Sequence, residues 1–187
     1  MEINCCSLSK SYNGKNVLQD LNWAIEQGDF WCVRGPSGIG KTTLLRIVLG
    51  LENADKGTVV RTQGLRFAPV FQEDRLLLGR SAVQNCMIFT NADEQHIRKV
   101  LIELLEDEES IDKPVEYLSG GMRRRVALAR ALVSDADILC LDEPFSGLDA
   151  ETREHVWNAL KKYRAGRTVI LVSHEFCPEN VKYLDLI

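Results

Sequence analysis

The chain has 187 residues, 45% of them hydrophobic, which suffices for a sizeable core and favours one domain. Its formal net charge of −4 argues against a nucleic-acid partner, and no apolar run approaches the roughly 18–20 residues needed to span a bilayer. Because the six cysteines form no Cys-x-x-Cys pair and the N-terminus lacks an apolar signal segment, we expect a cytosolic chain whose membrane part, if it has one, comes from another chain.

Two strands are expected at the start of the chain. Met1–Leu8 mixes apolar and polar side chains, Asn13-Gly14 is a strong turn signal, and the strand-like run Val17–Ile25 follows. Tyr12 precedes the turn. It is either an aromatic side chain packed on the sheet or a platform on which a nucleotide base stacks, and the residues alone leave both interpretations open.

The next segment has the pattern of a phosphate-binding P-loop. An apolar run, Phe30–Val33, is typical of a buried strand, and Thr43–Leu49 is expected to form a helix. Between them lie the motif residues Gly35, Pro36, Ser37, Gly38, Ile39, Gly40, Lys41 and Thr42. Glycines let the backbone approach a ligand, and successive N–H groups at a helix start attract an anion. Lys41 would reach the outer phosphates, and Thr42 would offer its hydroxyl to Mg²⁺.

Two strands are expected over Thr58–Thr62 and Leu65–Phe71, the second of which is closed by Gln72. After them the sequence changes from strand-like to helical patterns. Asn91-Ala92-Asp93-Glu94 resembles a helix start, with an N-cap and a Glu three residues on, and apolar residues then recur at helical spacing. We therefore predict a small helical subdomain, about residues 73–133, inserted into an α/β core formed by 1–72 and 134–187.

A second group of small residues precedes the helical run Met122–Val133. Leu118-Ser119-Gly120-Gly121 leaves the N–H groups of that helix accessible, which makes it a second possible anion site. Such a site could complete the nucleotide site of a neighbouring molecule. The following Arg123-Arg124-Arg125 is expected to be a solvated helix face.

Polar residues end two further buried strands. Ile138–Leu141 is followed by Asp142-Glu143, and Val169–Val172 by Ser173-His174, with a helix expected over Thr152–Tyr163. Alternating strands and helices predict a parallel sheet, whose carboxyl strand ends would gather these side chains around the P-loop. Asp142 could hold Mg²⁺ through water, and Glu143 could polarise an attacking water, which is an arrangement for nucleotide hydrolysis.

These motifs, in this order, resemble those of the ATP-binding cassette (ABC) ATPases over nearly the whole chain. The family's motifs correspond here to the Walker A loop Gly35–Thr42, the Q-loop Gln72, the signature Leu118–Gly121, the Walker B strand Ile138–Asp142, the catalytic Glu143, the D-loop Ser146–Asp149 and the switch His174. Tyr12 falls where the family has its adenine-stacking aromatic residue.

The resemblance implies a P-loop NTPase fold with a mainly parallel central sheet, an N-terminal antiparallel β subdomain and an inserted helical subdomain. It implies Glu143, His174 and Lys41 as catalytic residues and Thr42, Gln72 and Asp142 around Mg²⁺. ATP would be contacted by the motif residues already named and by Tyr12, Thr43, Gln72, Ser119, Gly120, Gly121 and Asp149.

The resemblance also implies partners. Two such subunits, identical or related, pack head to tail and sandwich two ATP molecules, and the helical region around Gln72 relays their motion to a transmembrane permease. The expected location is peripheral, on the inner face of the cell membrane, and a solute-binding protein is an open option. Val70–Leu77 is similar to the corresponding segment of nitrate, sulfonate and taurine importers.

The sequence departs from the family pattern in three places. Met122 replaces the signature's usual Gln, and a thioether cannot make an amide's hydrogen bonds. The helical region is shorter than usual, and the chain ends at Ile187, so we expect no C-terminal regulatory domain. An exporter or membrane-remodelling ATPase, a soluble non-transport cassette and a non-hydrolysing regulatory module are the alternatives, and neighbouring genes would separate importer from exporter.

Overall fold

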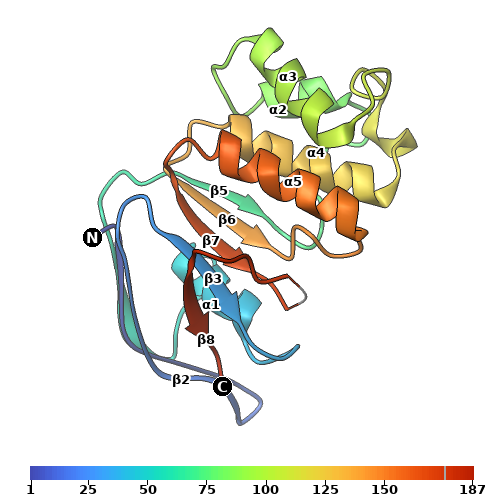
Figure 1. Ribbon diagram of the computed structural model, residues 1–187. Helices are drawn as coiled ribbons and strands as arrows, with labels where there is room; N and C mark the ends of the chain where they lie inside the picture. The colour runs from blue at the N-terminus through green and yellow to red at the C-terminus, as the bar shows by residue number, and fades with distance from the viewer. Residues whose placement is uncertain (175) are drawn as a thin grey trace.

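The computed structural model describes residues 1–174 and 176–187 and contains two sheets (Figure 1). The smaller sheet is antiparallel, with strand order β2-β1-β4, and consists of β1 (Ile3–Tyr12), β2 (Lys15–Ile25) and β4 (Lys56–Arg61). The two-residue turn between β1 and β2 has positive φ at both Asn13 and Gly14, as a tight hairpin turn requires. Tyr12, which pairs with Lys15, therefore lies at the tip of the hairpin.

The larger sheet has five strands in the order β5-β6-β7-β3-β8, and every pairing in it is parallel. Its strands are β3 (Phe30–Arg34), β5 (Phe67–Val70), β6 (Ile138–Asp142), β7 (Thr168–Val172) and β8 (Lys182–Asp185). Every residue of β6 and β7 is buried, because these central strands are covered on both faces. Pro69 is accommodated because β5 lies at an edge of the sheet.

Two apolar cores lie on the two faces of the parallel sheet. Alternate residues of β6 belong to different cores: Ile138 and Cys140 pack with helix α1 (Lys41–Val48) and the antiparallel sheet, whereas Leu139 and Leu141 pack with α4 (Gly120–Val133) and α5 (Ala150–Tyr163). Helices α2 (Ala82–Met87) and α3 (Glu94–Leu105) stack on α4 and α5, on the far side from α1 (Figure 1).

The fold class is therefore confirmed, whereas the boundaries 73 and 133 of the helical subdomain stay a prediction. Helices α2 to α4 fall within that range, together with a short 3₁₀ helix at Val115–Tyr117. Cys32 and Cys140 are fully buried, as expected of small hydrophobic residues. Within residues 1–174 and 176–187, no helix is both long and apolar enough to cross a bilayer.

Several element boundaries differ from the sequence-based expectation. Helix α3 begins after Asp93, whose carboxylate accepts from the His96 N–H, and not after Asn91. Helix α2 and strand β8 were not predicted. The signal for α2 is a capping box, in which the Ser81 hydroxyl and the Gln84 side chain each accept from the other residue's backbone N–H.

Candidate functional site

The P-loop joins the end of β3 to the start of α1. At two of its glycines, neighbouring backbone leaves no room for a side chain. Gly40, the N-cap of α1, has φ 116°, and a Cβ there would lie 2.7 Å from the Val17 carbonyl oxygen. A Cβ on Gly35 would lie 2.7 Å from the Leu186 carbonyl oxygen. Both contacts are with backbone, so a side chain at either position would displace β2 or the residues that follow β8.

Two polar side chains of α1 face the loop and the sheet. Lys41 is 7% exposed, and its Nζ donates to the carbonyl oxygens of Gly35, at 2.7 Å, and Pro36, at 3.0 Å. The Thr42 hydroxyl donates to Asp142 Oδ2 at 2.9 Å, which connects α1 with the end of β6. The structure thus brings together the P-loop and the carboxylate predicted to lie beside it.

Asp142 is the residue best suited to hold a metal ion. It is 1% exposed, and its Oδ1 is buried without a hydrogen-bond partner among the residues described. Burial raises the pKa of this carboxyl above its usual range, and the Glu143 charge adds to that rise, whereas the hydrogen bond from Thr42 opposes it. An unpaired oxygen beside a hydroxyl suits Mg²⁺, which prefers oxygen ligands.

Glu143 and His174 meet at the carboxyl ends of neighbouring strands β6 and β7. His174 Nδ1 lies 2.6 Å from Glu143 Oε1, and the His174 backbone N–H donates to Oε2 at 3.4 Å. Glu143 is 6% exposed and has φ 52°, the left-handed region, which costs roughly 1–3 kcal/mol in a non-glycine residue. Its N–H donates to the Val172 carbonyl of β7 at 2.9 Å.

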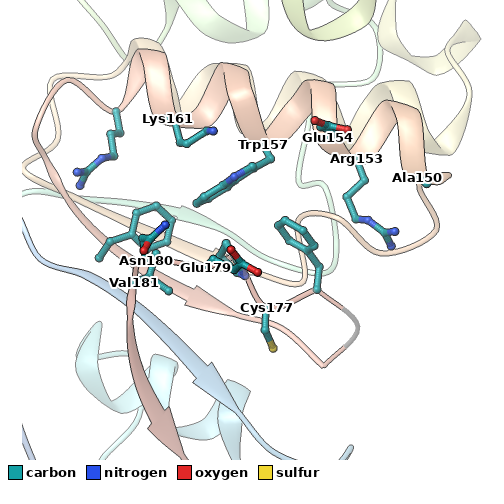
Figure 2. A pocket seen from close by; sticks show the side chains of 13 residues that line it. Ala150, Arg153, Glu154, Trp157, Lys161, Cys177, Glu179, Asn180 and Val181 are labelled. Atoms are coloured by element: carbon teal, nitrogen blue, oxygen red, sulfur yellow. The ribbon is translucent and has the colours of Figure 1, made fainter.

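Three aromatic rings lie near the Glu143–His174 pair, in the core on the face of the sheet that α4 and α5 cover (the helical side). Phe176 lies two residues after His174, and its ring centroid is 4.9 Å from that of Phe145 and 5.8 Å from that of Trp157 on α5. Figure 2 shows Trp157 and other α5 side chains above the segment that carries Cys177, across a cleft of about 700 Å³. The cluster therefore attaches the chain on both sides of the Glu143–His174 pair to α5.

Gln72 lies two residues after the edge strand β5, whose last pair in the register is Val70 with Leu141 of β6. Its backbone carbonyl accepts a hydrogen bond from Arg124 of α4, which also donates to the Glu143 carbonyl oxygen at 2.9 Å. The expectation of a solvated arginine face is therefore wrong for Arg124, whose side chain is 18% exposed. Three consecutive arginines do not reveal which of them turns inward, so the sequence held no signal for this contact.

Tyr12 and Thr43 lie at the side of the P-loop. Tyr12 is 43% exposed, and its hydroxyl donates to a Glu52 carboxylate oxygen. That hydrogen bond raises the pKa of the phenol. Glu52 Oε2 also lies 3.5 Å from Nε of Arg46 on α1, so the hairpin tip is next to α1. The exposed ring is thus held by its hydroxyl, and Glu52 is a second residue that the sequence did not single out.

The signature residues and Asp149 are not part of this cluster. Figure 1 shows the start of α4 well apart from α1, which lies on the other face of the sheet. Ser119 caps α4 by accepting from the Met122 N–H at 3.2 Å, and neither Gly120 nor Gly121 would bring a Cβ within 4 Å of another group. Asp149 caps α5, and both its oxygens accept from Thr152.

The thioether of Met122 also has a place in the fold. Its side chain is partly buried and packs against the core of the helical side. At the position where the family usually has Gln, this chain therefore has a side chain that makes an apolar packing contact within the chain itself.

A P-loop on the N-terminus of α1, a buried Asp at the end of a parallel strand and a neighbouring Glu–His pair define the class of P-loop nucleotide hydrolases. The family model described as "ABC transporter" matches residues 18–146. The chain belongs to the ABC transporter family and is an ATP-binding ATPase subunit.

Relatives and solved structures agree with this assignment. The aliphatic sulfonates import ATP-binding protein SsuB 1 of Rhodococcus jostii is 43% identical, over 88% of this chain and 69% of the relative. The Nod factor export ATP-binding protein I of Sinorhizobium fredii is 36% identical, over 92% of this chain and 55% of the relative. The dimeric structure of MJ0796, a bacterial ABC transporter cassette, matches with a TM-score of 0.81 and 28% identity, over 98% of this chain and 94% of that one.

Proposed function

We propose that this chain hydrolyses ATP as one of two cassettes in a membrane importer. The observation that carries the proposal is that the Glu143–His174 pair lies at the carboxyl ends of β6 and β7, where Thr42 of α1 also donates to Asp142. In this arrangement Lys41 neutralises charge on the outer phosphates, Glu143 orients the attacking water and His174 contacts the γ-phosphate. Mg²⁺, held by Thr42 and Asp142 with Gln72 nearby, would neutralise charge on the β- and γ-phosphates.

The other proposed nucleotide contacts fall into two groups. Tyr12 stacks on the adenine ring, beside Thr43 and the P-loop. Ser119, Gly120, Gly121 and Asp149 act on the nucleotide of an identical or related cassette packed head to tail. Support for this division comes from the separation of α4's start from α1 and from the space around Gly120 and Gly121. A second support is the MJ0796 cassette, whose solved structure is dimeric.

A permease partner is supported by an apolar surface next to the Q-loop. Exposed hydrophobic side chains cluster in sequence before α2 and from its last residue onward, namely Leu77, Leu78, Met87, Ile88 and Phe89. Phe89 also lines a groove of about 500 Å³, together with Phe71, Arg75, Arg130 and others. Such a surface fits an amphipathic helix, and we assign it to the permease, which would hold this chain at the inner face of the membrane.

Import is favoured by the likeness to the sulfonate import protein, which is 43% identical over 88% of this chain. Export is the second candidate, because the Nod factor relative covers 92% of the chain at 36% identity. The two are separated in vesicles that contain the permease by the side of the membrane that loses solute during hydrolysis. A solute-binding protein would take part only in import.

The experiment that tests the cassette mechanism is the solution mass of Glu143→Gln with and without Mg²⁺ and ATP. The substitution keeps the shape of the side chain and removes the carboxylate that orients water, so ATP persists between two cassettes. We expect a monomer to become a dimer on adding ATP, and Gly121→Trp in the same background to stay monomeric. A Glu143→Gln chain that binds ATP to saturation and stays monomeric would contradict the sandwich of two copies.

A further inference from the structure

Arg124 is the one described residue that donates hydrogen bonds to both the Q-loop and the backbone of Glu143. Its Nη1 donates to the Glu143 carbonyl oxygen at 2.9 Å, and its Nη2 donates to the Gln72 carbonyl oxygen. Its Nε lies 3.6 Å from an Asp74 carboxylate oxygen. A guanidinium has donors in a fixed planar fork, so these contacts hold three chain segments in one geometry.

Other arginines of α4 attach the Q-loop but do not reach Glu143. Arg130 donates to the carbonyl oxygens of Arg75, at 2.8 Å, and Asp74, at 3.3 Å. The loop after β5, at Gln72, Asp74 and Arg75, is therefore connected to α4 by side-chain contacts from that helix. Arg124 extends the attachment to the end of β6.

The backbone of Glu143 depends on few contacts for its left-handed conformation. Its N–H is held by Val172 of β7, and its carbonyl oxygen accepts from Arg124 and, at 3.2 Å, from the Ser146 N–H. The direction of the carboxylate follows from this backbone, because the side chain is buried against His174. Loss of the Arg124 contact would free the peptide that aims the carboxylate.

We propose that Arg124 is a positioning residue that aims Glu143 and makes its position depend on the Q-loop and on α4. The inference rests on the proposed role of Glu143 in hydrolysis. Helix α4 begins with Ser119 and Gly120, five and four residues before Arg124. A tilt of α4 on contact with a second cassette, or of the Q-loop on contact with a permease, changes the same pair of hydrogen bonds.

The test measures kcat and KM for ATP, nucleotide Kd and thermal stability for Arg124→Gln and for five companion variants. Arg98→Gln is the matched control, because Arg98 of α3 makes bidentate bonds to Asp112 and an ion pair with Glu94 but touches neither Gln72 nor Glu143. Arg130→Gln loosens the Q-loop alone. Glu143→Gln alone and combined with Arg124→Gln shows whether Arg124 acts through Glu143.

We expect Arg124→Gln to lower kcat about tenfold or more, with KM and Kd changed less than about twofold, since mispositioning alone costs this much. Arg124→Lys should recover little, because an ammonium lacks the planar fork in which Nη1 and Nη2 each donate to a different carbonyl oxygen. Arg98→Gln should lower the melting temperature and leave kcat intact. In the Glu143→Gln background, Arg124→Gln should cause no further loss.

Four results would overturn the inference. An unchanged kcat in Arg124→Gln, or an equal fall in Arg98→Gln at the same loss of stability, makes Arg124 a stabilising residue only. Additive losses in the double variant show that it acts without Glu143. If Glu143→Gln alone hydrolyses ATP at the normal rate, the proposed function fails and this inference fails with it. In the other three outcomes Glu143→Gln does not hydrolyse ATP at the normal rate, so the two kinds of failure are distinguishable.

Discussion

At the scale of single residues, the site contains one carboxylate whose ionisation opposes folding. Asp142 is buried with one oxygen unpaired among the described residues, and burial raises the pKa of its carboxyl. A raised pKa means that the folded chain binds this proton more tightly than the unfolded chain does. The stability that the folded chain gains from this tighter proton binding is therefore complete below the pKa of the unfolded chain, near 4. It is lost as the pH rises through the pKa of the folded chain.

We predict that Asp142→Asn makes the nucleotide-free protein more stable at pH 7, by about 1 kcal/mol, and gives no gain near pH 3.5. The amide oxygen still accepts from Thr42, while the charge is gone. The variant should also lose the extra stabilisation that Mg²⁺ gives together with ATP. Thermal unfolding at the two pH values, with and without Mg²⁺-ATP, measures both effects.

Asp149→Asn is the matched control for this prediction. Hydrogen bonds from Thr152 hold the pKa of the Asp149 carboxyl below its usual range, so its stabilising effect is present at neutral pH and is lost on acidification. Its substitution should therefore shift stability in the opposite direction at pH 7. A loss of stability in Asp142→Asn at pH 7 would contradict the desolvation argument.

At the scale of elements, the chemistry depends on how two loops are held against α5. Phe176 joins the segment after His174 to Phe145, two residues after Glu143, and to Trp157. The three rings meet edge to face, which is a favourable geometry for aromatic pairs. The cluster keeps both members of the Glu143–His174 pair at the ends of their strands.

We predict that Phe176→Ala lowers the free energy of unfolding by about 2 kcal/mol and lowers kcat more than KM, because both loops lose a shared anchor. Phe176→Leu retains apolar volume and should show smaller losses. Urea unfolding and steady-state ATP hydrolysis measure the two effects. Stability lost at full kcat would mean that the cluster supports the fold without positioning the pair.

The elements that were predicted from sequence are those whose physics is local. Strands β6 and β7 are largely apolar because a parallel sheet covered on both faces buries every one of their side chains, and β3 is apolar up to Val33. The bounds of all three strands agree with the prediction within one residue. Strand β8 was missed because its exposed, polar Lys182–Asp185 takes its place by pairing with β3, a contact between distant segments.

The residues of the candidate site likewise fall into those that the sequence predicts and those that it does not. The P-loop, Asp142, Glu143 and His174 were predictable, because strand ends of a parallel sheet converge. Arg124 and Glu52 were not, because their roles depend on which way a side chain points from a helix or loop. The structure likewise assigns Met122 to a core and Asp149 to a helix cap, which their motifs did not indicate.

At the scale of the whole molecule, the parallel sheet is the shared wall of two cores. Alternate side chains of β6 enter one core with α1 and the other with α4 and α5, and the strand ends at Asp142. The P-loop side and the helical side thus meet at one strand. We therefore expect a nucleotide that binds the folded chain at that strand's end to stabilise both sides together.

The surroundings of the glycines separate what the folded chain needs from what its assembly needs. Gly35 and Gly40 have backbone oxygens where a side chain would go, whereas Gly120 and Gly121 have open space. In a library of variants sorted by cellular abundance, alanine at the first two should be depleted and alanine at the last two retained. When the same library is sorted by transport, alanine at all four positions should be depleted. Positions depleted only in the transport screen would therefore map the surface of this chain that contacts a partner.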